Sequence, residues 1–329
     1  MIITRCPLRI SLVGGGTDLE EFIKENGHGA VVSFAPELYT YITLFSDKNG
    51  YNSVKKNYIV NYTNREIVGS IDEIKNDVAR EALKEYDMPP VSISFNTDVF
   101  SAGSGLASSS SYLIGLIKSV QRYQNIMCTD QSIAQQALEI ERKFNPLTGS
   151  QDTFGCALGG LKKMEFYPNG RVVSKKYEDT LFDNYDCYLI YTGVTRRSTG
   201  ILSTLNLEKT KESLPLVKEL GNALNRENYN RLFEIIKEGW AIKKETSQSI
   251  LNNRDLLDLD ETLSNAPEVE AHKLCGAGGG GYFLVFVESQ RPCHDLITKI
   301  EGFENRSFKI RPSSQGVQTA NVGGSAVFM

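Results

Sequence analysis

The sequence predicts an α/β (α+β) protein built from two domains. Its 329 residues are more than one hydrophobic core normally spans. The proportions of hydrophobic residues (40%) and charged residues (23%) are typical of a globular protein. Segments rich in β-branched and aromatic residues alternate with segments in which apolar residues recur at helical intervals, so strands and helices are mixed along the chain. We place the domain boundary at residue 178, which gives domains 1–178 and 179–329.

In the first third of the chain, a loosely alternating apolar pattern ends in a glycine turn. Residues 2–13 predict one strand, and GGGTD (14–18) a tight turn after it. A helix is expected from Leu19 to about Glu25. Further strands are predicted at 30–45, 57–62 and 91–96, and a helix is predicted at 71–86.

The middle of the chain predicts two consecutive helices. The loop at 101–111 leads into a helix predicted over Tyr112–Tyr123. A second helix is expected to begin near Thr129 or Asp130, either of which can cap it, and to end near Phe144, before Asn145-Pro146. The turn-rich residues that follow place Asp152 just after this helix.

The second half of the chain contains fewer strand signals. We expect a strand at Cys187–Tyr191, two or three amphipathic helices within 205–262, and a strand at Tyr282–Val287 after a glycine-rich turn. Residues 313–329 are weakly patterned, and no structure is assigned to them.

Charge and composition argue against several classes of protein. The net charge is −4, and no basic block is interleaved with aromatic residues, so nucleic acid is not an expected partner. The N-terminus does not resemble a targeting peptide, and no apolar run approaches the ~20 residues of a membrane span, so we expect a cytoplasmic protein without membrane contact. The six cysteines are scattered without metal-ligand spacing and are interpreted as reduced thiols.

The glycine- and serine-rich loop at 103–111 is a candidate phosphate site. Such a loop at the start of a helix offers backbone N–H groups and the positive end of the helix dipole to an anion. The loop matches neither the GxxxxGK[ST] pattern nor the GxGxxG pattern. A flexible surface linker is the alternative, although a linker would not normally lie between a predicted strand and an apolar-faced helix.

Two carboxylates are candidates for chemistry. Glu141 falls on the apolar stripe of its predicted helix, where a carboxylate needs either a salt bridge or a bound cation. Asp152 could be only a cap of the kind common in turns. In phosphoryl transfer, however, a carboxylate is needed close to the acceptor hydroxyl, so the two residues could divide metal binding and hydroxyl orientation between them.

Three motifs, in this order and spacing, resemble those of the GHMP kinase superfamily, which is named after galactokinase, homoserine kinase, mevalonate kinase and phosphomevalonate kinase. They are CPLR (6–9) through GGGTDL (14–19), Gly103–Ser111, and Cys275–Gly281. The resemblance implies the two-domain GHMP kinase fold with its active site in the interdomain cleft. It also implies an ATP-dependent sugar kinase that uses ATP and Mg²⁺.

The resemblance also implies roles for individual residues. Asp152 would accept the acceptor proton or orient the hydroxyl, and Arg9 would lie beside it and stabilise the transferring charge. Ser109 and Glu141 would hold Mg²⁺. The phosphates of ATP would contact Gly103, Ser104, Gly105, Leu106, Ala107, Ser108, Ser109 and Ser110. The sugar substrate would contact Gly15, Gly16, Thr17, Asp18, Gly149, Ser150, Arg196, Arg197, Gly278 and Gly279.

Within the superfamily, GGGTDL differs from the GEHTDY of galactokinases and is similar to bacterial D-glycero-D-manno-heptose 7-phosphate kinases and to the kinase part of fucose-metabolising enzymes. This resemblance implies phosphorylation of the anomeric C1 hydroxyl of the heptose 7-phosphate, on a route to nucleotide-activated heptose for surface polysaccharide. A substrate phosphate needs a cationic receptor, for which Arg196 and Arg197 are candidates, with Lys24, His28 and Arg5 behind them. A fucokinase- or galactokinase-like sugar 1-kinase and a non-catalytic sugar/ATP sensor remain alternatives, and a homodimer is one expectation for the oligomeric state.

Overall fold

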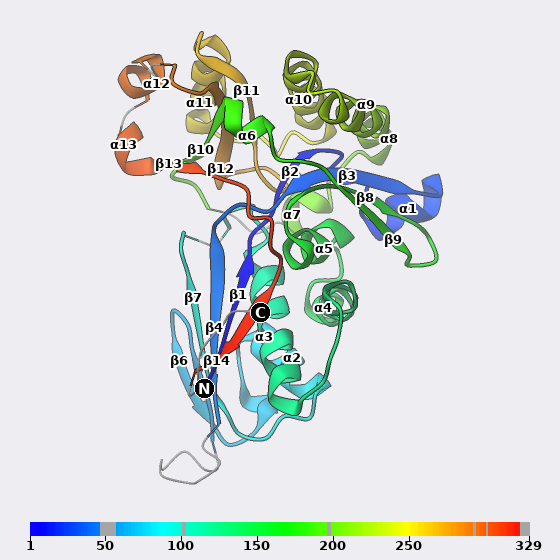
Figure 1. Cartoon of the computed structure of the whole chain (residues 1–329), viewed down its shortest axis with the longest axis vertical. Helices are drawn as coiled ribbons and strands as arrows, with labels where there is room; N and C mark the ends of the chain where they lie inside the picture. The colour runs from blue at the N-terminus through cyan, green and yellow to red at the C-terminus, as the bar shows by residue number, and fades with distance from the viewer. Residues whose placement is uncertain (47–56, 101–102, 196–198, 292–293, 301, 323–329) are drawn as a thin grey trace.

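The structure is a computed structural model of the whole chain, and it describes residues 1–46, 57–100, 103–195, 199–291, 294–300 and 302–322. Strands and helices are mixed along the chain, which confirms the α/β prediction (Figure 1). The strands are β1 Ile2–Pro7, β2 Ile10–Val13, β3 Gly29–Phe34, β4 Tyr39–Phe45, β5 Tyr58–Asn61, β6 Arg65–Val68, β7 Ser92–Thr97, β8 Leu161–Phe166, β9 Val172–Lys176, β10 Tyr185–Tyr191, β11 Val269–Leu274, β12 Tyr282–Glu288, β13 Ser307–Ile310 and β14 Gln318–Asn321. The helices are α1 Glu20–Asn26, α2 Asp77–Glu85, α3 Ser108–Gln124, α4 Asp130–Phe144, α5 Ser150–Leu158, α6 Leu181–Asn184, α7 Thr199–Leu202, α8 Leu207–Lys211, α9 Ser213–Asn225, α10 Tyr229–Thr246, α11 Arg254–Asn265, α12 His294–Lys299 and α13 Phe303–Arg306, with a 3₁₀ turn at Ile71–Glu73.

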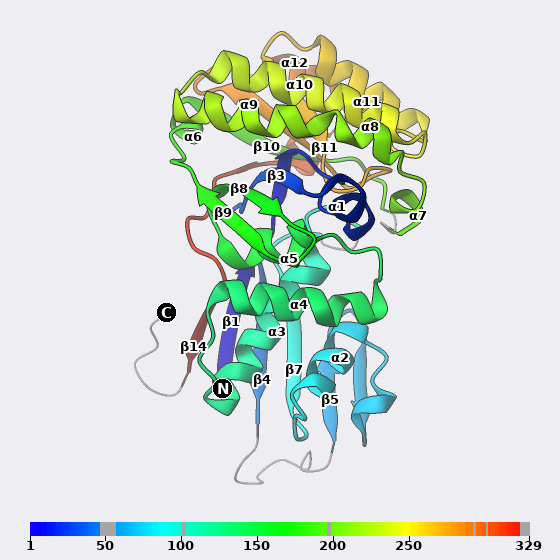
Figure 2. The same cartoon turned by 90° about the vertical axis from the view of Figure 1, so that its right-hand side faces the viewer.

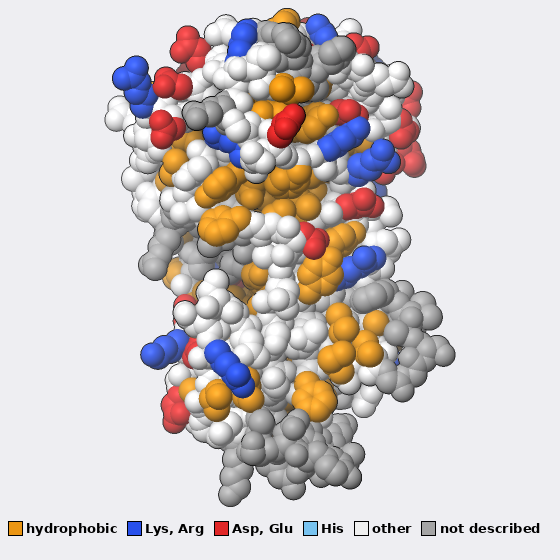
Figure 3. Space-filling view, turned by 90° about the vertical axis from the view of Figure 1, so that its left-hand side faces the viewer, with side chains coloured by type: hydrophobic (Ala, Val, Ile, Leu, Met, Phe, Trp, Pro, Cys, Tyr) orange, Lys and Arg blue, Asp and Glu red, His pale blue; other side chains and the backbone are white. Residues whose placement is uncertain are grey.

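The largest sheet has the strand order β14-β1-β4-β7-β5-β6. Its pairs are antiparallel except β5 with β7, which is parallel. Helices α2 and α3 cover one face of the sheet, and buried side chains such as Ile42, Ile93 and Leu113 form the core between them (Figure 1). Figure 3 looks onto the side of the molecule that faces away from α2 and α3, where groups of hydrophobic side chains lie among uncharged polar side chains and backbone.

A second sheet, with the order β2-β3-β8-β9, lies between two hydrophobic cores. Successive residues of β3 alternate between them: Val31 packs into the core under the large sheet, whereas Ala30 and Val32 pack into the core under the C-terminal helices. This alternation follows from the two-residue period of a strand. Figure 2 shows the sheet crossing the middle of the molecule.

The third sheet, with the order β11-β12-β10-β13, is antiparallel. Helices α8 to α11 lie at the same end of the molecule as this sheet (Figure 2). The C-terminal half contributes four helices within 205–265, where the sequence analysis expected two or three.

The prediction of a single strand over 2–13 was wrong, because the chain turns at Leu8 and Arg9 and passes from the first sheet to the second. At this turn the Leu8 amide donates to the carbonyl of Leu38 (2.9 Å), and the Arg9 amide donates to the carbonyl of Leu106 (3.1 Å). The segment 30–45 is likewise divided into β3 and β4. Arg9 therefore lies between a strand of the first sheet and a strand of the second, and its side chain bonds Asp152 and the carbonyl of Gly105.

Asp152 lies beyond the helix that ends at Phe144, as predicted, but the expectation that a turn surrounds it was wrong. Thr129 caps α4 as expected, since its hydroxyl accepts a hydrogen bond from the Ser132 amide (3.2 Å). After the turn at Asn145, however, a further helix α5 begins at Ser150, and Asp152 lies in its first turn. A carboxylate is favoured there because it faces the positive end of the helix dipole.

Two other boundaries differ from the sequence expectations. Helix α3 begins at Ser108, so the last serines of the candidate phosphate loop form its first turn. The unassigned C-terminal segment contains β14, which pairs with β1 at the edge of the large sheet. Division of the chain into domains at residue 178 remains a prediction. Strand β14 would not follow it, because β14 lies after residue 178 and pairs with β1.

Candidate active site

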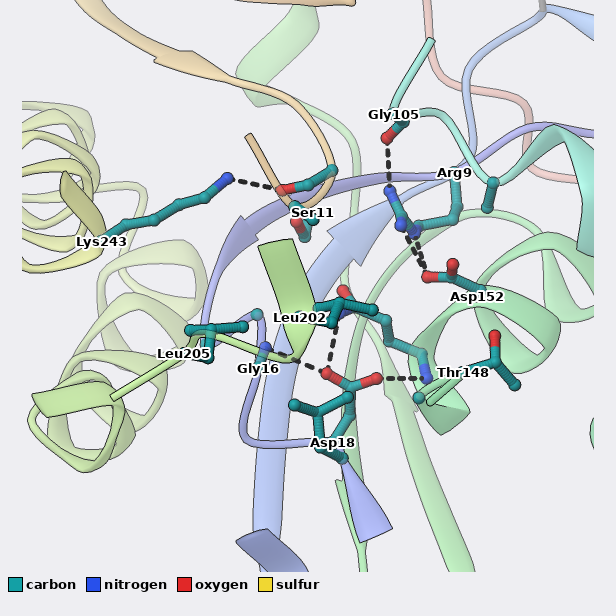
Figure 4. A pocket seen from close by; sticks show the side chains of 18 of the residues that line it. Arg9, Ser11, Gly16, Asp18, Gly105, Thr148, Asp152, Leu202, Leu205 and Lys243 are labelled. Atoms are coloured by element: carbon teal, nitrogen blue, oxygen red, sulfur yellow. Dashed lines mark hydrogen bonds and ion pairs between the residues drawn. The ribbon is translucent and has the colours of Figure 1, made fainter. Parts of the chain in front are cut away.

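A cavity of about 390 Å³ is lined by residues from both halves of the chain (Figure 4). The N-terminal half contributes the turn after β2, the serine loop, the C-terminal end of α4 and the N-terminal end of α5. The C-terminal half contributes α7 to α10 and the glycine turn after β11. The predicted residues that line the cavity are Arg9, Gly15, Gly16, Asp18, Gly103, Ser104, Gly105, Ala107, Ser108, Ser109, Ser110, Glu141, Gly149 and Asp152.

Arg9 and Asp152 form an ion pair at the cavity wall. The Arg9 Nε and Nη2 atoms donate to the same oxygen, Asp152 Oδ1, at 2.9 and 2.6 Å, and Nη1 donates to the carbonyl of Gly105 at 3.0 Å. The Arg9 side chain is 5% exposed and that of Asp152 25% exposed. Burial disfavours the guanidinium charge, but the charge and hydrogen bonds of Asp152 outweigh burial and raise the pKa of Arg9. Among the described residues, no donor bonds Asp152 Oδ2.

The serine loop is held by close backbone packing against the third glycine motif. A Cβ atom on Gly105 would lie 2.7 Å from the carbonyl oxygen of Cys275, and one on Gly281 would lie 2.2 Å from that of Ser104. Ala107 adopts a left-handed φ of 63° immediately before α3. Phosphate-binding turns have this combination of small residues, a left-handed step and a helix N-terminus.

Glu141 is buried at the inner end of the cavity. The Ser110 hydroxyl donates to Glu141 Oε2 at 2.6 Å, and the Glu141 side chain is 2% exposed. Burial raises the pKa of Glu141 to about 7, with the charge of Asp152 acting in the same direction and hydrogen bonds from Ser110 and Ser109 opposing. A cation that enters the cavity would stabilise the ionised form of this carboxylate.

The donor set fits Mg²⁺ held partly by a nucleotide. Within the described ranges, no three histidine, cysteine or acidic side chains gather into a metal cluster. Mg²⁺ does not require one, since it commonly binds one or two carboxylates together with substrate phosphates and water. Glu141 supplies a carboxylate, and Ser109, which is exposed, supplies a hydroxyl beside it.

Asp18 lies on another wall of the cavity and is fully buried. Its Oδ1 accepts hydrogen bonds from the Gly16 amide (3.1 Å) and from Gln151 Nε2 (2.7 Å), and its Oδ2 accepts one from the Gln151 amide (3.0 Å) (Figure 4). Burial and the charge of Asp152 raise the pKa of Asp18 to about 6. The hydrogen bonds from Gln151 and Gly16 and the charge of Arg9 oppose this shift, and they fix the orientation of the carboxylate.

Two lysines from the C-terminal half also line the cavity. The Lys273 ammonium donates to the carbonyl of Leu12 at 2.8 Å, and among the described residues no carboxylate pairs with it. Burial lowers the pKa of Lys273 to about 8, and the charge of Arg9 adds to that effect. Lys243 donates to the carbonyls of Leu274 and Gly276 at 3.0 and 2.5 Å. The described lining therefore carries the basic side chains of Arg9, Lys243 and Lys273 beside the carboxylates of Asp18, Glu141 and Asp152.

Several residues predicted to bind a ligand do not line the cavity. Leu106 belongs to the hydrophobic core, and the Thr17 hydroxyl bridges the carbonyls of Gly14 and Ala30. Ser150 is buried at the start of α5. Gly278 and Gly279 both contact Ile250: the amide of Gly279 donates to its carbonyl, and Gly278 packs against the residue. Arg196 and Arg197 lie outside the described residues.

The three secondary basic candidates also lie away from the cavity lining. Lys24 pairs with Glu20 on the exposed side of α1, and Arg5 bonds Gln318 on the large sheet. His28 is exposed.

The sequence reasoning assigned no role to several lining residues. They include the polar side chains of Gln151, Lys243 and Lys273. Leu202, Leu205 and Thr210, from the C-terminal half, also line the cavity. Lys273 lies two residues before the third glycine motif, and this was the available signal for it. The wall residues had no such signal, because ordinary amphipathic helices carry the same residue types.

In the part of the chain that the structure describes, no helix combines the length and the apolar character needed to cross a membrane.

A cavity that combines a phosphate loop, a buried carboxylate and an arginine–aspartate pair is typical of enzymes that transfer a phosphoryl group to a small molecule. Comparison with known proteins agrees with this class. Residues 72–160 match the family model of the GHMP kinases N-terminal domain. The chain is 30% identical over 307 residues to a D-glycero-alpha-D-manno-heptose 7-phosphate kinase of Campylobacter jejuni, covering 87% of this chain and 89% of that protein.

Two further relatives are more distant. An L-fucokinase/L-fucose-1-P guanylyltransferase of Bacteroides fragilis is 24% identical over 342 residues, which cover 85% of this chain and 34% of that protein. A crystal structure of a D-glycero-D-manno-heptose 1-phosphate kinase from Bacteroides thetaiotaomicron has the same fold. The comparison of the two structures gives a TM-score of 0.76 at 21% sequence identity and covers 98% of this chain and 99% of the other. This chain belongs to the GHMP kinase family and is an ATP-dependent sugar kinase close to the heptose phosphate kinases.

Proposed function

We propose that this kinase transfers the γ-phosphoryl group of ATP to the anomeric C1 hydroxyl of D-glycero-D-manno-heptose 7-phosphate. The products are the 1,7-bisphosphate and ADP. The reaction would contribute, in the cytoplasm, to the synthesis of nucleotide-activated heptose for surface polysaccharide. The 30% identity to the Campylobacter jejuni heptose 7-phosphate kinase supports the choice of sugar.

The arrangement of Arg9 and Asp152 is the observation that carries the proposal. Arg9 bonds only Oδ1 of Asp152, so Oδ2 can accept a hydrogen bond from the acceptor hydroxyl. In the reaction, the acceptor oxygen bonds the γ-phosphorus, the bond from that phosphorus to the β,γ-bridging oxygen breaks, and the hydroxyl proton passes to Asp152. Because phosphoryl transfer is largely dissociative, orientation of the hydroxyl contributes more than early removal of its proton.

The nucleotide would occupy the side of the cavity formed by the serine loop. The amides of 103–110 would contact its phosphates at the N-terminus of α3. Glu141 and Ser109 would hold Mg²⁺, which when bound would neutralise charge on the phosphate oxygens. The guanidinium of Arg9 would lie beside the transferring group and stabilise its charge.

The sugar would occupy the side of the cavity formed by Asp18 and the glycine turn. An oriented carboxylate can accept hydrogen bonds from two sugar hydroxyls. Gly15 and Gly16 keep this wall free of side chains. Lys243 and Lys273 are the described cations that could receive the substrate phosphate, together with the predicted Arg196 and Arg197.

A panel of sugars tests the proposal. The protein is incubated with ATP, Mg²⁺ and, separately, D-glycero-D-manno-heptose 7-phosphate, L-fucose, D-galactose or D-mannose 6-phosphate, and ADP release is measured. We expect the highest kcat/KM with the heptose 7-phosphate. Preferred turnover of fucose or galactose would replace the proposed substrate with that of another sugar 1-kinase. Saturable ATP binding without turnover of any sugar would favour a non-catalytic sensor.

A further inference from the structure

Lys162, on strand β8 outside the cavity, is a fully buried cation. Its side chain has no exposed surface, and its ammonium donates to three carbonyl oxygens, those of Gly155 (2.9 Å), Gly159 (3.0 Å) and Gly160 (3.2 Å). Among the described residues, no carboxylate pairs with it. Burial of an ammonium without a counter-ion costs several kcal/mol, and it lowers the pKa of Lys162 to about 7. We therefore expect Lys162 to have a role in the protein that offsets this cost of burial.

The three carbonyls lie at the C-terminal end of helix α5. This helix ends at Leu158, and its C-cap residue Gly159 has a φ of 61° and a ψ of 177°. Of its last carbonyls, that of Ala157 accepts a hydrogen bond from the Val317 amide (3.2 Å). The last carbonyls of a helix need partners, and they lie at the negative end of its dipole. Lys162 supplies hydrogen-bond donors to this end of the helix, at the carbonyls of Gly155 and Gly159.

The same helix carries Asp152 and contacts its partner Arg9. Asp152 lies in its first turn, and Gly155 lies against the side chain of Arg9. A Cβ atom on Gly155 would be 3.0 Å from both Cβ and Cγ of Arg9. Lys162 therefore bonds the carbonyl of the residue on which Arg9 packs, and any shift of α5 would move Asp152 relative to Arg9.

We propose that Lys162 is a positioning residue for phosphoryl transfer, acting by capping the C-terminus of α5 and so fixing Asp152 against Arg9. This proposal rests on the proposed function of Asp152. A misplacement of about 1 Å at a reacting group can cost about 100-fold in rate, so even a small movement of α5 would reduce turnover.

Lys162→Met tests the proposal, with Lys163→Met as the matched control. Lys163 is the next residue on β8, and its side chain is 24% exposed and bonds Glu165. We expect Lys162→Met to lower kcat about 10- to 100-fold, with the KM for ATP changed less than about twofold. Lys163→Met is expected to retain the wild-type kcat. Rates are normalised to the folded fraction, counted by saturable ATP binding well below the Tm.

A double variant separates positioning from a purely structural role. If Lys162 acts through Asp152, Lys162→Met in the Asp152→Asn background will lower kcat little further. An equal loss of kcat in both backgrounds would overturn the proposal. A lowered Tm with an unchanged kcat per folded molecule would also overturn it.

A second substitution covers failure of the first to fold. If Lys162→Met is insoluble, Lys162→Gln, which keeps two hydrogen-bond donors, is measured in its place, and the same results for kcat and Tm support or overturn the proposal. Failure of the proposed function would be seen separately, as absent sugar phosphorylation by the wild-type protein.

Discussion

Gly105 and Gly276 approach so closely that neither has room for a side chain. A Cβ atom on Gly276 would lie 2.5 Å from the Cα of Gly105, and one on Gly105 would lie 3.2 Å from the Cα of Gly276. Both residues also have a positive φ, 77° and 64°. The serine loop and the third glycine motif, which are 170 residues apart in the chain, therefore support each other's conformation.

Gly276→Ala is predicted to weaken ATP binding. The new methyl group would force the two loops apart, and the left-handed φ would add about 1 kcal/mol or more of strain. We expect a lower Tm and at least a several-fold higher KM for ATP. Gly69→Ala is the control, because its Cβ would meet nothing within 4 Å and its φ is not positive. An unchanged KM for ATP in Gly276→Ala would show that this contact does not shape the nucleotide site.

Asp152→Asn is predicted to lower kcat by a factor of about 10² to 10⁴, the usual contribution of a positioned acid or base. Asparagine can keep one oxygen directed at Arg9, so the fold and ATP affinity should change little. Steady-state kinetics and ATP titration measure the two effects. A kcat close to that of the wild type would remove Asp152 from the chemistry.

Sugar phosphorylation is predicted to depend on the ionisation of Asp18. Its pKa in the folded protein is raised to about 6, so the carboxylate that accepts sugar hydroxyls is present above this pH and lost below it. The value of kcat/KM for the sugar should fall about tenfold per pH unit below about pH 6. Because the folded pKa exceeds the unfolded one, the contribution of Asp18 to stability falls as the pH rises from about 4 to 6.

The matched variant for this pH profile is Asp18→Asn. It is expected to have low activity without the acidic limb that Asp18 causes. A wild-type profile that remains flat down to pH 5 would contradict the assignment of Asp18 to the sugar.

Glu141→Gln is predicted to raise the Mg²⁺ concentration needed for half-maximal activity by tenfold or more. Glutamine can still accept the hydrogen bond from Ser110, and it removes a buried carboxylate, so the Tm should not fall substantially. Mg²⁺ titration at saturating ATP measures the shift. The same Mg²⁺ dependence in the variant and the wild type would exclude Glu141 as a ligand.

The sequence was most informative where local chemistry determines local structure. The glycine and serine pattern of 103–111 predicted a turn leading into a helix. Thr129 was one of two adjacent candidate caps, Thr129 and Asp130, because N-caps depend on nearest neighbours. The pairing of Arg9 with Asp152 was reached only through the family resemblance. Their 143-residue separation in sequence means that no local pattern connects them.

Other features depended on tertiary contacts. The break at Leu8 and Arg9 occurs because two sheets meet there, and the apolar pattern continues across it. The weakly patterned strand β14 forms because the edge of β1 is available to pair with it. Lys162 had no recognisable signal, since it contacts the end of helix α5, which was not predicted as a helix.

The most direct test of the central claim identifies the product by ³¹P NMR after reaction of the protein with ATP, Mg²⁺ and D-glycero-D-manno-heptose 7-phosphate. The account predicts a second sugar-phosphate resonance, coupled to the anomeric proton, that accumulates in step with ADP and forms about 10² to 10⁴ times more slowly with Asp152→Asn. No new heptose resonance, with formation of a 1-phosphate from fucose or galactose under the same conditions, would contradict it.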